Sequence, residues 1–387
     1  MLLVGILTGL IILVLLVVIH ELGHGIAARR NVVVVEEFGI GFPPFAWGKK
    51  VKQSILGKNV LYSLNWLPLG GFVKLQGEYD SASKKGDYGA ATYGQKTNIL
   101  LAGVLMNWLT AVVLFTLLAL VGMPKILPNQ FSVPSDTVTT TKPVTIVAVQ
   151  AGSPAEKAGL KKGDNVLLVK SNDIESSADL SEATKRYSGK EVDVTYSRGG
   201  QEYTTTVKLR GQKDAAKGYL GVSSNQQLSE IRSTWSAPIV GVVTTAQLTG
   251  ETFTALGKVV TSLGEGIATR FSSDEATRKS GDEALAYASS SVSGPVGILG
   301  VIFPQMQQAG IKPLILLTAV ISLSLAVMNI LPIPALDGGR WATMTVFKLL
   351  KKPLSKEREE KIQTIGFITL MGLVVLVTVA DVSKLIG

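Results

Sequence analysis

Four long apolar runs constrain this chain more than any other feature of its sequence. None of them holds a charged side chain, and they lie at residues 2–19, about 99–123, about 313–331 and about 365–380. A helix needs about 20 apolar residues to cross the hydrocarbon core of a bilayer, so each run predicts a transmembrane helix. The first run lacks the basic start and the small-residue cleavage site of a secretory signal peptide, and we therefore interpret it as a permanent span.

Charge outside these runs predicts the orientation of the chain. Residues 25–97 hold ten Lys and Arg against five Asp and Glu, and residues 339–363 hold seven against three. The segment 123–310 is nearly balanced, at nineteen against eighteen. Because basic loops stay in the cytoplasm, we expect the balanced segment and both termini on the opposite side. The net charge of +9 is then a consequence of topology, and no other feature indicates nucleic acid binding.

The segment between the first two runs is unusually apolar for a loop. Residues 31–75 are rich in Val, Phe, Trp and Leu, which predicts strands joined as a hairpin by a turn at 57–59. We expect this sheet to dip into the bilayer surface or into a cavity. Residues 78–97 are small and polar, and they predict a mobile loop.

A small α+β module is expected at about 143–212, after a Pro-, Thr- and Ser-rich linker at 124–142. Residues 247–271 show helical spacing of apolar side chains with a polar opposite face. This pattern fits either a helix on the membrane surface or a helix packed on the soluble module. The local signals within the module are an N-cap at Ser153 with Pro154 after it, helical spacing at 177–187 and a hairpin turn at Gly199–Gly200.

The end of the first run carries the residues most suited to chemistry. The sequence has two histidines, His20 and His24, and Glu21 follows the first. Histidines four residues apart project from one face of a helix, so both can bind one tetrahedral metal ion, with the glutamate beside a water on that metal. This is the H-E-x-x-H pattern of zinc hydrolases, and ionisable groups at membrane depth usually mark functional sites.

A catalytic zinc needs a third protein ligand and an open position for water. The chain has no cysteine and no third histidine, so this ligand must be a carboxylate. We favour Asp337, which follows the third run on the side of the two histidines, in a stretch that Pro332 and Pro334 keep out of regular helix. An ordinary Asp-Gly turn is the alternative role for Asp337. The other candidate ligands are Glu36, Glu37 and Asp381.

These residues belong to a set of motifs that resembles the site-2 protease family of intramembrane zinc metalloproteases, in its bacterial regulatory branch. The motifs occur in the family's order and cover nearly the whole chain. They are HELGH at 20–24, FGIGF at 38–42, LPLGGFVKLQGE at 67–78, AGVLMN at 102–107, SGPVGI at 293–298 and NILPIPALDGG at 329–339. The soluble module is similar to a PDZ domain, chiefly through AGSPAEKAGLKKGD at 151–164.

The resemblance implies a role for each matching residue. His20, His24 and Asp337 would bind Zn²⁺, and Glu21 would be the general base. A membrane-associated hairpin that includes Gly41, Gly70 and Gly71 would present substrate as an added strand, and Asn329, Pro332 and Pro334 would shape the substrate-binding edge. The implied substrates are transmembrane segments of single-span proteins, such as an anti-sigma factor or leftover signal peptides, in a bacterial inner membrane whose lipid surrounds the protein. A peptide C-terminus is a further ligand for the PDZ domain.

The fold class that follows is a polytopic α-helical membrane protein with a membrane-associated β-hairpin and an inserted α+β PDZ domain outside the cytoplasm. Val104 and Pro43 depart from residues common in the family, which affects loop geometry and not the metal ligands. GYLGV at 218–222 is either a remnant of a second PDZ module or a closing strand. The expected domains are 1–123 with the β region 31–75, 124–215 as the PDZ domain, 216–310 as a further extracytoplasmic segment and 311–387.

Two other classes of function are weighed against a protease. A membrane scaffold would bind peptides through its PDZ domain and keep an inert zinc site. A metal transporter would need a string of polar residues through its spans, which these runs lack. Every position that catalysis requires is filled, so an enzyme is the favoured prediction.

Overall fold

The computed structural model describes residues 2–140, 143–212, 218–224, 229–270, 272 and 274–386. The chain separates into two compact units. Unit 1 comprises Met1–Leu118 and Pro238–Gly387, and unit 2 comprises Ala119–Ala237.

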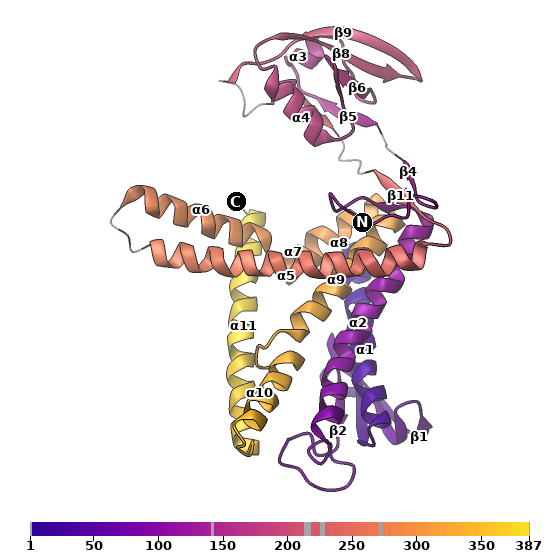
Figure 1. The fold of residues 1–387 in the computed structure, drawn as a ribbon, viewed down its shortest axis with the longest axis vertical. Helices are drawn as coiled ribbons and strands as arrows, with labels where there is room; N and C mark the ends of the chain where they lie inside the picture. Colours follow the sequence, from indigo (N-terminus) through magenta and orange to yellow (C-terminus); the bar gives the residue numbers. More distant parts are fainter. Residues whose placement is uncertain are drawn as a thin grey trace. The chain divides into compact units, whose positions relative to one another are not determined.

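The four predicted spans are confirmed as long apolar helices. They are α1 (Leu2–Arg30), α2 (Tyr93–Val121), α9 (Ile311–Ile330) and α11 (Lys356–Ile386), and each is long and apolar enough to cross a membrane. A helix satisfies its own backbone hydrogen bonds, which a spanning segment must do in lipid. Figure 1 shows that α1 begins and α11 ends at the same end of unit 1.

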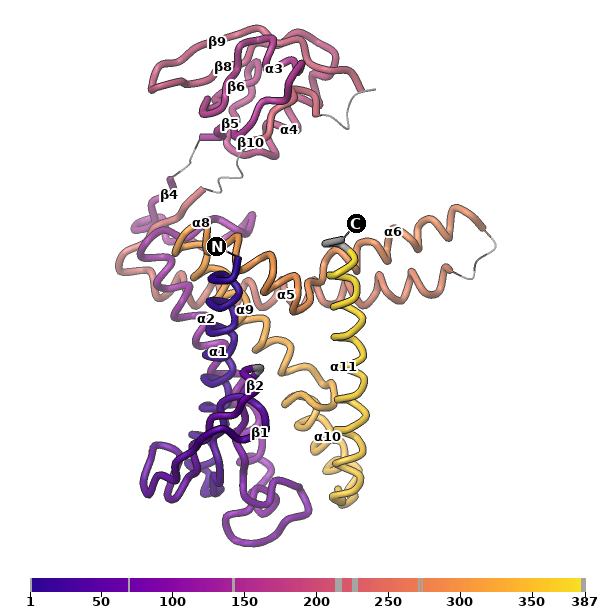
Figure 2. Tube along the Cα trace, turned by 180° about the vertical axis from the view of Figure 1, so that it is seen from behind, coloured from indigo at the N-terminus to yellow at the C-terminus, as the bar shows by residue number. Residues whose placement is uncertain are grey.

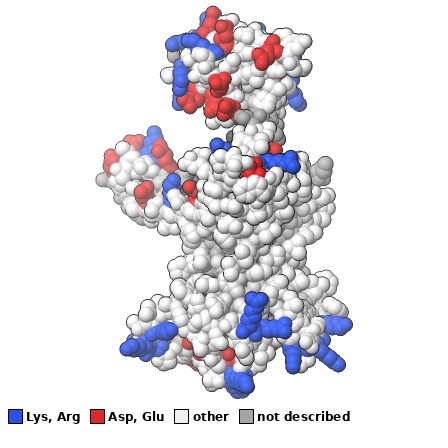
Figure 3. Space-filling view, turned by 45° about the vertical axis from the view of Figure 1, so that its right-hand side comes forward, with Lys and Arg blue, Asp and Glu red and all other residues white. Residues whose placement is uncertain are grey.

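The surface of unit 1 agrees with a membrane environment. On the face that Figure 3 shows, a wide belt of the helical region has no charge, and charged side chains lie at its two ends. Lys and Arg dominate the end that carries the hairpin of β1 and β2 (Figures 1 and 3). The protein is therefore a multi-pass membrane protein.

The hairpin consists of β1 (Val35–Ser54) and β2 (Gly57–Leu75), and its two long strands fold back on themselves. Residues 35–40 of β1 pair with 71–75 of β2 on one side and with 61–64 on the other, and 61–64 also pair with 47–50. The predicted turn at 57–59 is wrong by two residues. Ile55 and Leu56 join the strands instead, because Ser54 already pairs with Gly57.

Helices α5 (Ala237–Thr269) and α6 (Glu275–Ser291) lie across the end of unit 1 at which α1 begins (Figures 1 and 2). The helix predicted from the spacing at 247–271 is thus confirmed as far as Thr269, where α5 ends, and Phe271 lies outside the described residues. After α6 the chain passes through α7 (Pro295–Gly297), a π-helical turn at Ile298–Ile302 and α8 (Phe303–Ala309). Gly5 and Gly9 of α1 let α8 approach, since a Cβ at either would overlap Pro304 or Phe303.

Unit 2 contains a six-stranded sheet with two short helices, as the sequence predicts for an α+β module. Its strand order is β10-β5-β6-β8-β9 with β7 beside β6. Ser153 caps α3 (Pro154–Lys157) by accepting from the Glu156 amide at 3.2 Å, and α4 is Ser177–Arg186. The strands are β5 (Val144–Val149), β6 (Asn165–Val169), β7 (Asn172–Asp173), β8 (Glu191–Arg198), β9 (Gln201–Lys208) and β10 (Val222–Ser224).

Residues 218–222 and the linker at 124–142 both contribute to sheets in or beside unit 2's folded module. GYLGV leads into β10, which closes the sheet against β5, so the closing-strand interpretation is the correct one. The linker at 124–142 is not free of structure, because β3 (Met123–Pro124) and β4 (Val138–Thr140) pair with β11 (Glu230–Arg232) in a small sheet. Thr141 and Lys142 lie outside the described residues.

Candidate metal centre

The two histidines lie on one face of α1, one turn apart, and both are buried, with about 7% of each residue exposed. Their Nε2 atoms are 3.1 Å apart. The i and i+4 spacing on a helix produces this proximity without help from tertiary structure. The sequence therefore encodes half of the centre locally.

The third member of the cluster comes from the other end of the chain. The helix α9 stops at Ile330, and α10 (Asp337–Leu349) begins with the aspartate itself. Asp337 Oδ2 lies 3.0 Å from His20 Nε2 and 3.2 Å from His24 Nε2. Gly338 and Gly339 allow this approach, because a Cβ at either would overlap a backbone carbonyl of the chain that precedes α10.

The donor set fits a zinc ion. The Nδ1 of His24 lies 2.7 Å from the Ile99 carbonyl, which can only accept, so Nδ1 carries the proton and Nε2 presents a lone pair. Asp337 Oδ2 is buried and has no hydrogen-bond donor among the described residues. The three ligand atoms form a triangle with sides of 3.0–3.2 Å. Ligands at about 2.0–2.1 Å from a tetrahedral zinc lie about 3.3 Å apart, so a small relaxation admits the ion.

Asn107 of α2 supports the other histidine. Its side-chain amide lies 3.4 Å from His20 Nδ1, and its Oδ1 is buried without a partner among the described residues. Amide oxygen and nitrogen are assigned from the hydrogen-bond network, and exchanging them places Oδ1 against a protonated Nδ1. In that orientation Asn107 fixes the tautomer that leaves His20 Nε2 free for a metal.

Two glycines allow α1 and α2 to approach each other closely at this point. A Cβ at Gly23 would lie 2.5 Å from the carbonyl oxygen of Ala102, and a Cβ at Gly103 would overlap the rings of both histidines. Gly103 was not predicted as a site residue, although it lies within the AGVLMN motif, which is the only signal for it.

Glu21 is positioned by the hairpin. Its Oε2 accepts a hydrogen bond from the Val73 amide of β2 at 3.0 Å, and its Cγ lies 3.7 Å from the position that a Cβ of Gly71 would occupy. The carboxylate that follows the first histidine therefore lies between the metal ligands and the segment 71–75. This segment is an outer strand of the hairpin, because its only strand partner among the described residues is 35–40 of β1.

A network of buried charges fixes the start of α10, and the sequence did not reveal it. Arg340 lies one turn after Asp337 and donates to Glu359 of α11 at 3.1 Å and to the Glu78 carbonyl. Glu359 also accepts from the Asp80 amide at 2.9 Å, so the polar loop expected at 78–97 is fastened to α10 and α11. The Arg340 guanidinium lies 4.8 Å from the ring centre of Tyr88, whose pKa is raised by burial.

The other predicted residues lie elsewhere. Among the alternative ligands, Glu36 pairs with Lys74 at 3.4 Å, Glu37 accepts from Ser63 at 2.6 Å and Asp381 accepts from the Gly297 amide at 2.8 Å. None of the three joins the cluster of His20, His24 and Asp337.

The residues expected to bind substrate lie in the hairpin and in the break between α9 and α10. Gly41 and Gly70 have positive φ angles of 79° and 153° at bends of the hairpin. The Asn329 side chain donates to the Leu325 carbonyl within α9, and Pro334 packs against Gly366 of α11. Pro332 is exposed in the break.

The model of peptidase family M50 matches residues 8–373. The chain belongs to peptidase family M50. A putative zinc metalloprotease of Clostridium perfringens is 31% identical over 371 residues, which cover 95% of both chains. A Bacillus subtilis protein named "Regulator of sigma-W protease RasP" is 25% identical in an alignment of 451 residues. The alignment covers 96% of each of the two chains. The M50 family is zinc-dependent, and this member is an intramembrane zinc metalloprotease.

One solved structure is similar to a part of this chain. It is the PDZ domain of an SdrC-like protein from Listeria monocytogenes, 23% identical, and the match covers 22% of this chain and 90% of that one. The TM-score of this match is 0.20.

Proposed function

We propose that this M50 peptidase hydrolyses peptide bonds within the transmembrane segments of single-span membrane proteins, as a step in regulated intramembrane proteolysis. The substrates proposed are an anti-sigma factor or the remnants of signal peptides. The protein would lie in a bacterial inner membrane with its catalytic residues toward the cytoplasm and both termini outside. The observation that supports this most is the convergence of three possible ligand atoms beside a glutamate, among helices that are long and apolar enough to span a bilayer.

His20, His24 and Asp337 would hold the metal, and Glu21 would act on water. Zinc bound there supplies a Lewis acid that polarises the scissile carbonyl and lowers the pKa of a water toward neutrality. Glu21 takes the proton of the attacking water and passes it to the leaving amine. The hydrogen bond from the Val73 amide holds the Glu21 carboxylate in one orientation for both transfers.

The segment 71–75 would bind the substrate. A transmembrane helix satisfies its own backbone hydrogen bonds, so it must unwind before one of its peptide bonds can be attacked. Among the described residues, 71–75 pairs with no strand at its outer edge, where the Val73 amide donates to Glu21, so an unwound segment would add there beside Glu21 through the other backbone groups. Gly70 and Gly71 would belong to the substrate-binding edge, and Asn329, Pro332 and Pro334 would shape the opposite wall.

The remaining domains would control access. We assign residues 1–123 and 311–387 to the catalytic membrane region, 124–215 to an extracytoplasmic PDZ domain and 216–310 to an extracytoplasmic segment with a membrane-surface helix. The strand β10 at Val222–Ser224 extends the folded PDZ-like module beyond residue 215. This domain either binds the C-terminus of a trimmed substrate or excludes substrates with bulky outer domains.

The test is a comparison of the wild type with Glu21→Gln, each co-expressed with candidate single-span proteins. Loss of cleavage with retention of zinc supports a protease, and accumulated uncut transmembrane stubs are the expected result. Glu36→Gln is the matched control, because Glu36 is exposed and, among the described residues, pairs only with Lys74. A scaffold with an inert zinc site would show no difference between the three proteins.

A further inference from the structure

Unit 1 has a cavity that His20, Glu21, His24 and Asp337 do not line. Its volume is about 930 Å³, and its walls come from α1, α2, α5 and α9. The chemistry of the wall changes along its length: apolar side chains of α2 and α9 form most of it, and polar side chains gather at one end. The polar residues at that end are Arg30, Asn31, Thr97 and Asn98.

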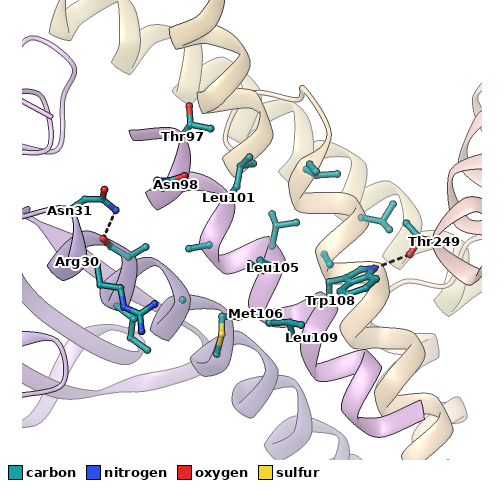
Figure 4. Close-up of a pocket in the computed structure, with 18 of the residues that line it drawn as sticks. Arg30, Asn31, Thr97, Asn98, Leu101, Leu105, Met106, Trp108, Leu109 and Thr249 are labelled. Carbon is teal, nitrogen blue, oxygen red and sulfur yellow. Dashed lines mark hydrogen bonds between the residues drawn. The ribbon is translucent and has the colours of Figure 1, made fainter. Parts of the chain in front are cut away.

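Figure 4 shows Leu101, Leu105 and Leu109 in a row along α2 and Arg30 at the end of α1, and all four residues line the cavity. Trp108 lies toward the far end, where its Nε1 donates to Thr249 Oγ1 of α5 at 3.2 Å. From Thr97 to Leu109 the helix rises about 18 Å. This is close to the depth of one leaflet, since the hydrocarbon core of a bilayer is about 30 Å thick.

Arg30 is the cation that this cavity offers to a ligand. It is exposed, and its guanidinium has no hydrogen-bond or ion-pair partner among the described residues. The neighbouring Arg29 is also exposed but donates to the Ser54 and Ile55 carbonyls of the hairpin turn, at 2.9 and 2.7 Å. One of two adjacent arginines is therefore used by the fold, and the other is available.

We propose that this cavity binds an anionic phospholipid. Its phosphate would pair with Arg30, and an acyl chain would lie along Leu101, Leu105 and Leu109 between the helices. A cation at the border of the bilayer with an apolar slot beneath it matches an amphiphile with a negative head group. A transmembrane helix from another protein fits less well, because it would cover Arg30 with apolar side chains and leave its charge unpaired.

The site would lie apart from the metal. Gly23 contributes to the cavity wall, whereas Gly103 on the other side of the α1–α2 contact faces the two histidines. A lipid bound here would lie against α1 and α2 at the contact that shapes the catalytic centre, without touching a metal ligand. This inference is independent of the proposed substrate and of the catalytic roles.

The experiment is a titration of the purified full-length protein with phosphatidylglycerol and with phosphatidylcholine, followed by native mass spectrometry. We expect the wild type to retain phosphatidylglycerol more tightly. Arg30→Gln should weaken phosphatidylglycerol by about fivefold and leave phosphatidylcholine unchanged. Arg29→Gln is the matched control, and it should leave the affinity for phosphatidylglycerol unchanged because the Arg29 side chain is engaged elsewhere.

A second pair of variants tests the apolar part. Leu105→Trp fills the slot and should reduce retention of phosphatidylglycerol, whereas Leu117→Trp on the same helix, outside the cavity, should not. Equal affinity for the two lipids in the wild type would overturn the proposal, and so would equal effects of the two arginine variants or of the two tryptophan variants. Capture of a substrate helix instead of lipid by a photo-crosslinker at position 105 would overturn it as well.

Discussion

Gly103 of α2 faces the imidazole of His24 so closely that a Cβ at this position would overlap Nε2 of the ring. The same Cβ would lie 2.8 Å from Cε1 and Nε2 of His20. A single methyl group would therefore enter the space between the two histidines. The helix α2 is part of the wall of the metal centre through its backbone, without contributing a ligand.

Gly103→Ala should consequently lose bound zinc. The added methyl displaces the histidine rings, and the triangle of ligand atoms opens beyond the distances that one ion can span. Zinc per protein, measured by mass spectrometry of the purified chain, should fall well below that of the wild type. Gly94→Ala in the first turn of the same helix is the control, because a Cβ there meets nothing within 4 Å. Full zinc occupancy in Gly103→Ala would contradict this view of the contact.

The metal ligands could be predicted from the sequence, whereas the residues that support them could not. His20 and His24 follow from helical periodicity alone, and Asp337 was chosen because few acids lie near the spans. Nothing in the spacing of residues identifies Gly103, because its importance depends on the angle at which two helices cross. The misplaced hairpin turn has a similar origin: Gly57 is typical of turns, but pairing with Ser54 decides where the strands end.

The Arg340–Glu359 pair was also invisible in the sequence, where both belong to a basic, polar stretch that predicts a solvated surface. Arg340→Met should lower the free energy of unfolding by about 3 kcal/mol, because it leaves Glu359 buried without its cationic partner. A lower melting temperature in detergent is the measurement. The double variant Arg340→Met/Glu359→Leu should be more stable than Arg340→Met, since it removes the unpaired charge. If the double variant melts lower still, unpaired burial is not the cause.

Asp136 should make the stability of unit 2 depend on pH. Burial alone would raise the pKa of this carboxyl, but hydrogen bonds from Thr234 and Ser236 outweigh burial and lower the pKa to about 2. The folded-state pKa is thus below the ordinary value of about 3.9. The stabilisation is therefore fully present above about pH 4, and it is lost as the pH falls toward 2.

Asp136→Asn should accordingly melt below the wild type at neutral pH, and the difference should shrink as the pH falls below about 4. Melting temperatures measured across this range provide the test. Asp282→Asn is the control, because Asp282 is exposed and has no hydrogen-bond partner among the described residues. A difference between Asp136→Asn and the wild type that stays constant with pH would mean that the carboxylate charge is not responsible.

Replacing residues 143–224 with a short Gly/Ser linker should reveal what the PDZ-like module does. The module has its own core, which includes Ile146, Val166 and Val194, so its removal need not disturb the helices of unit 1. If the module excludes bulky substrates, the shortened protein should cut single-span proteins that still carry a large outer domain, which the wild type leaves intact. If it instead recognises a trimmed C-terminus, the shortened protein should cut trimmed substrates poorly. The shortened chain with Glu21→Gln should cut neither kind of substrate, and this control separates its cleavage from that of other proteases in the preparation. If the shortened protein and the wild type choose between the two kinds of substrate in the same way, both roles are contradicted.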